Sequence, residues 1–144
     1  MIEKANLKDL VSLYNIEQEV FFNDPFALNK KAIKYHLIKS RIYKIVLDEN
    51  IAGYILWLER KKYFRLYSLA IASKYQNRGL AKELLEYSFN LLKEKNKNYS
   101  LEVKQSNENA IELYKKFGFE VNKTLKDYYK KEDGFLMMKK RIDA

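Results

Sequence analysis

One long apolar run, followed by a polar turn and a helical pattern, constrains the fold of this chain more than any other feature. The run covers Tyr63 to Ala72, and the helical pattern opens at Gly79 and continues to about Lys95. A strand that is apolar at nearly every position is typical of the centre of a sheet that is covered on both faces. The sequence therefore predicts a covered central strand, followed by a helix that packs against its sheet.

Capping residues and hydrophobic periodicity predict three further helices and five further strands. Asn6, Asn29 and Asn107 are the expected helix caps, and Gly118 is the expected end of the last helix. The expected helices cover 6–19, 29–40 and 107–117, and the expected strands cover 43–47, 52–58, 99–103, 119–125 and 135–140. This order favours a mixed α/β sheet of about six to seven strands flanked by about four helices, in a single domain over residues 1–144.

Three more specific expectations concern which residues face inward and where a loop lies. The first helix should bury one face, and the helix after Gly79 should bury a leucine stripe. The last two strands should be joined by a loop that contains Asp133-Gly134. The expected inward residues are Leu7, Leu10, Val11 and Tyr14 in the first helix, and Leu80, Leu84, Leu85, Leu91 and Leu92 in the later one.

Composition excludes several classes of site. There is no cysteine, so disulfides, thiolate metal sites and cysteine nucleophiles are excluded, and the only histidine, His36, lies in an amphipathic helical stretch. We expect no metal site. No segment has the pattern of a signal peptide, and no apolar run approaches the roughly 20 residues that span a membrane, so we expect a cytoplasmic protein without membrane contact.

The formal net charge of +9 favours acidic partners or a phosphorylated cofactor. The lysines are spread along the whole chain and are mixed with acidic residues, so a solvated lysine-rich surface explains the charge equally simply. We therefore expect no direct binding of nucleic acid.

The junction from Ile71 to Lys82 is the strongest local signal for chemistry. A strand ends, a polar turn follows, and Gly79 opens a helix, so free backbone N–H groups and the positive end of the helix dipole point to one place. Gly79 allows an anion to approach the backbone, and Arg78 and Lys82 add positive charge. The junction lacks the glycines of a Walker or dinucleotide motif. Such a junction can also be a simple tight connection.

A second segment, Leu101 to Phe119, resembles a hallmark of the GNAT superfamily of N-acetyltransferases. The hallmark is a strand, then Asn-x-x-Ala (Asn107 to Ala110), then aromatic-x-x-x-Gly-Phe closing a short helix. The junction resembles the pyrophosphate motif of the same superfamily, Gln/Arg-x-x-Gly-x-Gly/Ala, on Gln76, Gly79 and Ala81. Both motifs occur in the order and spacing of the superfamily, and the resemblance covers nearly the whole chain.

Within the superfamily the chain is most similar to the ribosomal-protein-alanine (RimI-like) N-acetyltransferases. The matching segments are 14–18, 69–71, 101–103 together with Tyr114, and 127–129 before Asp133-Gly134. Two departures stand out: Asn23-Asp24-Pro25-Phe26 replaces the usual Pro-Trp loop, and Ala81 replaces a glycine. The first departure leaves the acceptor open.

The resemblance implies transfer of acetyl from acetyl-CoA to an amine. It implies that Glu102 is the general base and that Tyr114 donates the proton to the leaving thiolate, although a strand-edge carboxylate and a core aromatic are the simpler readings of these two. It also implies that Phe26 and Tyr128 line the acceptor site, where plain packing is the alternative. The implied cofactor-binding residues are Leu69, Ala70 and Ile71 through their backbone, the junction residues Gln76, Asn77, Arg78, Gly79, Leu80, Ala81 and Lys82, and Asn107.

The expected acceptor is the N-terminal α-amine of a protein, for which a ribosomal protein is a natural client. The alternatives are a small amine, such as a polyamine, an amino sugar or an antibiotic, and a ribosome- or nucleic-acid-binding module without catalysis. The retained motif residues argue against the inactive module. The sequence contains nothing that decides the oligomeric state.

Overall fold

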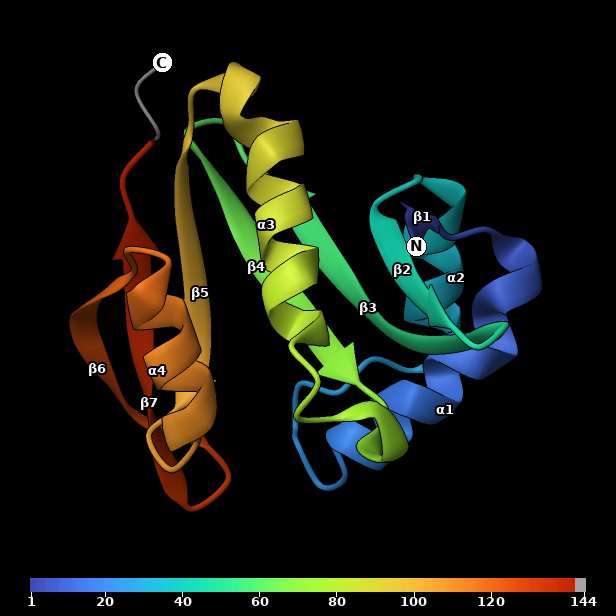
Figure 1. Ribbon diagram of the computed structural model, residues 1–144. Coiled ribbons are helices and arrows are strands. Elements are labelled where there is room, and N and C mark those ends of the chain that lie inside the picture. Colours follow the sequence, from blue (N-terminus) through green and yellow to red (C-terminus); the bar gives the residue numbers. More distant parts are fainter. Residues whose placement is uncertain (142–144) are drawn as a thin grey trace. The chain divides into compact units, whose positions relative to one another are not determined.

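The computed structural model describes residues 1–141 and contains, within this range, one seven-stranded sheet and four α-helices (Figure 1). The strand order is β1-β2-β3-β4-β5-β7-β6. The strands are β1 (Ile2–Lys4), β2 (Ile42–Leu47), β3 (Asn50–Glu59), β4 (Tyr63–Ile71), β5 (Asn98–Lys104), β6 (Glu120–Tyr129) and β7 (Glu132–Lys139). The helices are α1 (Leu10–Val20), α2 (Lys30–Ile38), α3 (Leu80–Leu92) and α4 (Glu108–Lys116). The predicted mixed α/β sheet and its four helices are confirmed.

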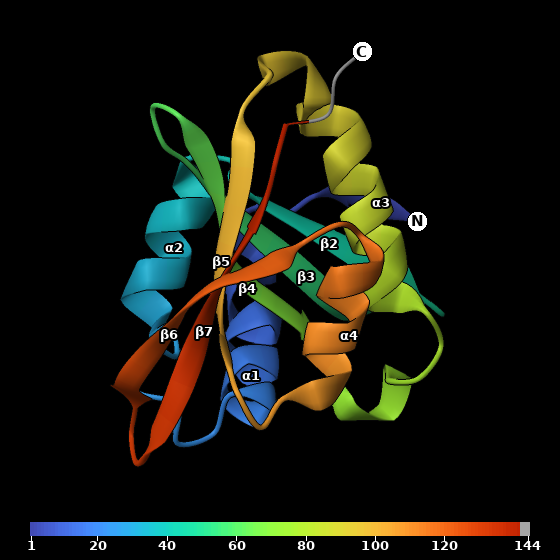
Figure 2. The ribbon, with the colours of Figure 1, turned by 90° about the vertical axis from the view of Figure 1, so that its left-hand side faces the viewer.

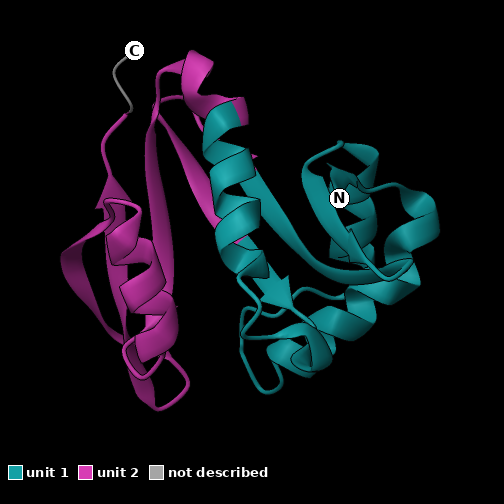
Figure 3. Ribbon diagram, viewed as in Figure 1, with its two compact units in different colours: residues 1–57, 68–90 teal, residues 58–67, 91–144 magenta. Residues whose placement is uncertain are grey.

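The chain forms two compact units, which are coloured separately in Figure 3. Unit 1 holds residues 1–57 and 68–90, and unit 2 holds residues 58–67 and 91–144, of which 91–141 are described. The boundary divides both β3 and β4. Unit 1 therefore contains the end of β4 and the junction into α3, whereas unit 2 contains β5, α4 and the two C-terminal strands.

Unit 1 has helices on both faces of its strands. Successive side chains of a strand point to opposite faces. On β2, Lys44 pairs with Asp9 at the start of α1 at 3.0 Å, while its neighbour Tyr43 contacts the ring of Tyr87 on α3. On β3, the Trp57 ring contacts Phe89 of α3. This two-sided cover explains why residues 52–58 of β3 are buried without interruption.

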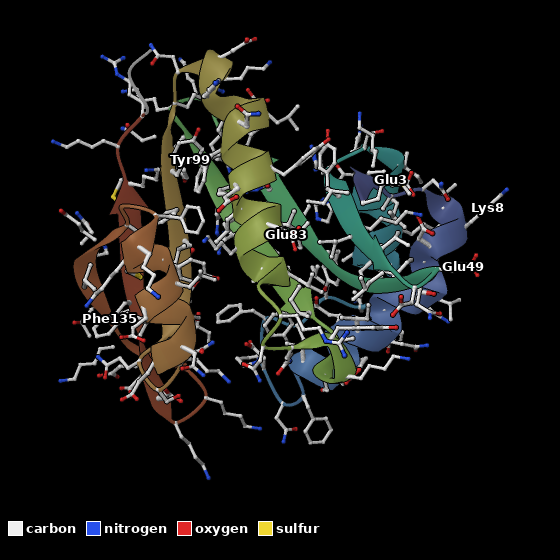
Figure 4. The ribbon with its side chains drawn as sticks, in the orientation of Figure 1. Glu3, Lys8, Glu49, Glu83, Tyr99 and Phe135 are labelled. Atoms are coloured by element: carbon white, nitrogen blue, oxygen red, sulfur yellow. The ribbon has the colours of Figure 1, made fainter. Side chains whose placement is uncertain are left out.

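Unit 2 buries one face of its strands against α4. Figure 2 shows α4 beside β5, β7 and β6, on one side of these strands. Ile111 and Tyr114 are the buried residues of α4, and the Tyr114 ring packs edge to face against Phe119 at 5.8 Å. Tyr99, labelled on β5 in Figure 4, is almost fully buried and stacks on Phe64. The other face of these strands carries partly exposed polar side chains, and they form the candidate site of this unit.

The expectation that the run from Tyr63 to Ala72 is covered on both faces is wrong. Burial alternates along β4: Phe64 and Leu66 are buried, whereas Arg65 and Tyr67 are half-buried. The continuously buried strand is β3. The aromatic ring of Tyr67 and the alkyl stem of Arg65 let this face look apolar in sequence, although both side chains are only half-buried.

Two predicted helix faces are wrong in part. In the first helix, Leu7 and Val11 are more than half exposed, and the buried residues of α1 are Leu13, Ile16 and Glu17. In α3, Leu80, Leu84 and Leu85 are buried as expected, but Leu91 is 46% exposed and Phe89 is buried instead. Apolar residues occur on more than one side of each helix, so periodicity alone does not select the face that packs.

The predicted loop at Asp133-Gly134 is also wrong, because both residues lie within β7. The connection between β6 and β7 is a tight turn in which Lys131 takes a left-handed conformation, with φ of 65°. A side chain at Gly134 would place its Cβ 2.6 Å from the Tyr129 ring, so this glycine serves close packing rather than a turn.

Candidate functional site

The junction between β4 and α3 has the backbone geometry expected of an anion site. Asn77 and Gly79 both have left-handed conformations, with φ of 65° and 77°. The first helical hydrogen bond of α3 runs from the Glu83 N–H to the Gly79 carbonyl at 3.1 Å. The backbone N–H groups at the helix start before Glu83 therefore have no acceptor within the helix. A Cβ built on Gly79 would meet no atom within 4 Å, so the space beside this residue is open.

The side chains of the junction have different tasks. The Gln76 amide donates to the Ile71 carbonyl at 3.0 Å, so it closes the turn back onto the end of β4. The Arg78 guanidinium lies 5.6 Å from the centre of the Tyr75 ring, and Lys82 forms a long, exposed pair with Glu86 at 3.8 Å. Gln76 therefore shapes the turn, whereas the exposed cations Arg78 and Lys82 have side chains long enough to reach a bound anion.

In unit 2, Glu102 is the centre of a polar cluster on the half-buried face of β4 and β5. Arg65 holds its carboxylate with two donors, Nη2 to Oε1 at 2.8 Å and Nε to Oε2 at 3.1 Å. The Tyr128 hydroxyl donates to Oε1 at 3.4 Å. A carboxylate has about four lone-pair positions and these contacts use three, so one position remains on Oε2 for a further donor.

A bulge in β6 brings Tyr128 to this cluster. Leu125 pairs with Gly134 and Tyr129 pairs with Glu132, so residues 126–128 stand opposite Asp133 alone. The Asp133 carboxylate accepts the Asp127 N–H at 2.8 Å and so satisfies the bulged backbone. Bulges re-aim side chains. Burial, and next the charge of Glu102, raise the pKa of Tyr128, so its hydroxyl remains a donor at neutral pH.

Tyr114 and Asn107 lie on α4 in the same unit. Tyr114 is 9% exposed, and burial raises the pKa of its hydroxyl, which therefore stays protonated at any physiological pH. Asn107 caps α4, with its Oδ1 accepting the Ala110 N–H at 3.3 Å. Gly118, with φ of 96°, ends the helix as predicted.

Unit 1 contains a second polar cluster, centred on Glu17 of α1. This carboxylate is 2% exposed and accepts the Leu28 N–H at 2.9 Å, the Ser68 hydroxyl at 3.0 Å and the Tyr54 hydroxyl. Burial raises its pKa from 4.5 to about 6, although the Leu28 and Ser68 hydrogen bonds oppose the change. A carboxyl group with this pKa changes its ionisation just below neutral pH.

The structure divides the predicted site residues between the two units. Unit 1 holds Phe26, the strand residues 69–71 and the junction residues 76–82, and unit 2 holds Glu102, Asn107, Tyr114 and Tyr128. Sequence reasoning missed Arg65 and Glu17. Each is a single charge at a position whose neighbours on the same face are apolar, and this pattern is the signal by which both could have been found.

Residues 7–119 match the acetyltransferase (GNAT) family. The chain belongs to this family. It is 41% identical to an N-alpha-acetyltransferase of Sulfurisphaera tokodaii, over 94% of this chain and 90% of that protein, and 27% identical to N-alpha-acetyltransferase 50 of Danio rerio, over 88% and 76%. Among solved structures, the ribosomal-protein-S18-alanine N-acetyltransferase from Escherichia coli has a TM-score of 0.88 and 25% identity, covering 100% of this chain and 95% of that chain.

As a member of this family the chain is an acetyltransferase that uses acetyl-CoA as its donor. The observed junction fits such a donor, because it offers open space at Gly79, backbone N–H groups at a helix start and nearby cations. Within residues 1–141 no helix is both long and apolar enough to cross a membrane, and no group of three or more histidine, aspartate or glutamate side chains is arranged to hold a metal ion.

Proposed function

We propose that this enzyme transfers acetyl from acetyl-CoA to the N-terminal α-amine of a protein. The observation that carries the proposal is the Glu102 cluster, in which an oriented carboxylate keeps one acceptor position for a donor such as an amine. The similarity to N-alpha-acetyltransferases over most of the chain supports the same acceptor.

Most of the residues proposed to hold the donor lie in unit 1. The N–H groups at the start of α3 and the side chains of Arg78 and Lys82 bind the pyrophosphate of acetyl-CoA. Leu69, Ala70 and Ile71 follow the part of β4 that pairs with β5, which ends at Leu66, and their backbone binds the pantetheine arm as an added strand would. Asn107 of unit 2, whose oxygen caps α4, is a further proposed contact of the donor through its amide nitrogen.

The reaction joins the acceptor nitrogen to the acetyl carbonyl carbon and breaks the bond between that carbon and the CoA sulfur. The amine loses a proton, which Glu102 accepts directly or through water. The departing thiolate gains a proton, for which the Tyr114 hydroxyl is the donor. Because burial raises the pKa of Tyr114, this hydroxyl is always protonated when a turnover begins.

The proposed acceptor is a better match to this base than a lysine side chain is. An α-amine has a pKa of about 7.7–8.0 and a lysine about 10.4, so at neutral pH the lysine is far more costly to deprotonate. Phe26 and Tyr128 are the proposed walls of the acceptor site. We further propose that the client is a cytoplasmic protein, with ribosomal proteins as the first class to test, and that residues 1–144 act as one domain.

A steady-state screen tests this function. Peptides that begin with Ala, Ser or Met are compared with spermidine and with an aminoglycoside, and CoA release is measured at pH 7.5. Each peptide is also supplied with a blocked N-terminus and a free lysine. We expect turnover with free N-termini and not with the blocked peptides. A preference for spermidine or the aminoglycoside over every peptide would contradict the α-amine acceptor while leaving the acetyltransferase assignment intact.

A further inference from the structure

The loop between α1 and α2, residues 21–29, presents aromatic side chains and is held internally by short-range hydrogen bonds. Phe22 is 76% exposed and Phe26 is 40% exposed. The Asp24 carboxylate accepts the Phe26 N–H at 2.8 Å, and the Asp24 carbonyl accepts the Ala27 N–H at 3.1 Å. Such local bonds define the shape of a loop but do not fix its position on the protein.

Glu17 links this loop to the sheet of unit 1. Its Oε2 accepts the Leu28 N–H at the end of the loop, whereas its Oε1 accepts the hydroxyl groups of Tyr54 on β3 and Ser68 on β4. One oxygen therefore binds the loop and the other binds two strands. Leu28 itself is buried, so the loop is anchored at this end by packing and by the carboxylate together.

The same end of α1 also contacts the turn that follows β4. Glu19 accepts the Ser73 N–H at 2.9 Å, just beyond the end of the strand. The two contacts, at Ser68 and at Ser73, bracket residues 69–72, which include the backbone proposed to bind the pantetheine arm. The last turns of α1 thus join the aromatic loop to the strand segment that carries the donor.

An ionisable side chain is an energetically unfavourable choice for this buried position. Burial of a carboxylate costs free energy unless its partners compensate, and an apolar side chain of similar size often gives equal or greater stability. The raised pKa of Glu17 shows that here its hydrogen bonds do not fully compensate for burial. A role in positioning, rather than in stability, accounts for a carboxylate at this site.

We propose that Glu17 is a positioning residue that holds the 21–29 loop against β4 and so places Phe26 for the acceptor. This inference rests on the proposed function, because it assigns the loop to the acceptor amine. Glu17 touches neither substrate. Its effect is on the binding of the acceptor, and the donor site at the junction keeps its own backbone geometry without it.

The hydrogen bonds of the bridge predict which substitutions are tolerated. Hydroxyl groups can donate or accept, whereas the Leu28 N–H can only donate. A glutamine at position 17 can accept from Leu28 with its oxygen and donate to Ser68 with its amide nitrogen. Glu17→Gln should therefore preserve the bridge, and Glu17→Leu should remove it while filling similar space.

The test measures KM for an accepted peptide and for acetyl-CoA separately. For Glu17→Leu we expect the peptide KM to rise about tenfold, as the loss of one hydrogen bond to a charged group implies, with the acetyl-CoA KM changed less than about twofold. Glu17→Gln should stay near the wild type. Asp9→Leu is the matched control. Asp9 is a second buried carboxylate, at the start of the same helical segment, but it pairs with Lys44 and does not contact the loop. An unchanged peptide KM, or an equal rise in both KM values, would overturn the proposal.

Hydrogen exchange at the Leu28 amide provides a readout that needs no acceptor. Its protection should fall in Glu17→Leu and persist in Glu17→Gln, and unchanged protection in Glu17→Leu would overturn the bridge. Loss of Leu28 protection in a chain that acetylates no peptide would refute the proposed function but not the bridge. Should Glu17→Leu fail to fold, Ser68→Ala removes a contact on the sheet side alone, and the same two measurements apply to it.

Discussion

Glu102 is oriented by Arg65, which stands 37 residues before it in the chain. A guanidinium that binds both oxygens of a carboxylate fixes the direction of the remaining lone pair, which a freely rotating side chain would not do. The pair is partly buried, with side-chain exposures of 26% and 18%. The proposed base is therefore held in place before the amine arrives.

Glu102→Gln should slow acetylation of a peptide N-terminus most strongly near pH 7. Glutamine keeps the size and polarity of the side chain but cannot accept the proton. The defect should shrink towards pH 9, because solvent has by then deprotonated most of the α-amine. The measurement is a pH–rate profile of wild type and variant on one peptide that begins with Ala or Ser.

Glu59→Gln is the control for this profile. Glu59 also forms an ion pair in unit 2, with Lys97 at 2.7 Å, but it lies outside the Glu102 cluster. The Glu59→Gln substitution should leave the pH–rate profile unchanged. A Glu102→Gln defect of constant size from pH 7 to pH 9 would remove the role of base and leave Glu102 as a residue that orients the acceptor.

Tyr114→Phe should lower turnover by roughly 10²-fold, the lower end of the range for general acid catalysis, with little change in acetyl-CoA affinity. The substitution keeps the ring that packs on Phe119 and removes only the hydroxyl. Tyr99→Phe is the matched control, because Tyr99 is another buried tyrosine of unit 2 whose pKa is raised by burial. Equal turnover in both variants would mean that Tyr114 serves as core packing.

At the scale of elements, the junction between β4 and α3 is the part of the molecule that local sequence describes best. Its turn, its glycine and its helix start all follow from neighbouring residues, and the structure has each of them. Helix caps behave in the same way, since Asn6, Asn29 and Asn107 all accept backbone N–H groups as predicted. Features that depend on residues a few positions apart could be predicted.

Gly79→Glu should abolish the rise in melting temperature that acetyl-CoA produces. The new side chain would fill the open space beside the helix start and place a negative charge there, and a ligand that cannot bind cannot stabilise the folded state. Differential scanning fluorimetry with and without acetyl-CoA measures the effect.

Asn96→Glu controls for strain and charge together. Asn96 also has a left-handed conformation, with φ of 55°, and it lies beyond the other end of α3. This variant should lose some stability but keep the full acetyl-CoA shift. If acetyl-CoA still produced the full rise in melting temperature in Gly79→Glu, the pyrophosphate would bind elsewhere.

At the scale of the whole molecule, Glu17 should make stability depend on pH. Its pKa is raised from 4.5 to about 6 in the folded state, so the folded chain binds this proton more tightly than the unfolded chain does. The free energy of unfolding should therefore fall by about 2 kcal/mol as pH rises through this window, and remain lower above it.

Urea unfolding of the wild type and of Glu17→Gln at pH 4.5 and pH 7 measures this contribution. Glutamine does not titrate, so the stability of the variant relative to the wild type should rise by most of this roughly 2 kcal/mol between the two pH values. Other carboxylates titrate in both proteins and cancel in the comparison. An identical difference at the two pH values would contradict the raised pKa.

From Asn6 onward, sequence reasoning predicted the order of the α-helices and strands, but it missed β1 and the contacts between distant residues. The pairing of Arg65 with Glu102, and of Glu17 with Ser68, joins residues 37 and 51 positions apart, and only the folded backbone determines such neighbours. The exposed Leu7 and Val11 have the same explanation, because which face of a helix packs depends on its partner. Asp133-Gly134 was misplaced because the fit of Gly134 against Tyr129 has no signature in local sequence.

The outer strand β6 has a consequence for the behaviour of the chain at high concentration. It stands last in the strand order of the described residues, so one edge of its backbone lacks a partner strand, and such edges invite pairing with other copies. Here Lys123 and Lys126 are exposed along it, and the bulge at 126–128 breaks its straightness. Charge and irregularity together discourage the addition of another strand. Neutral substitutions at these lysines would therefore lower the solubility of the chain and favour its aggregation.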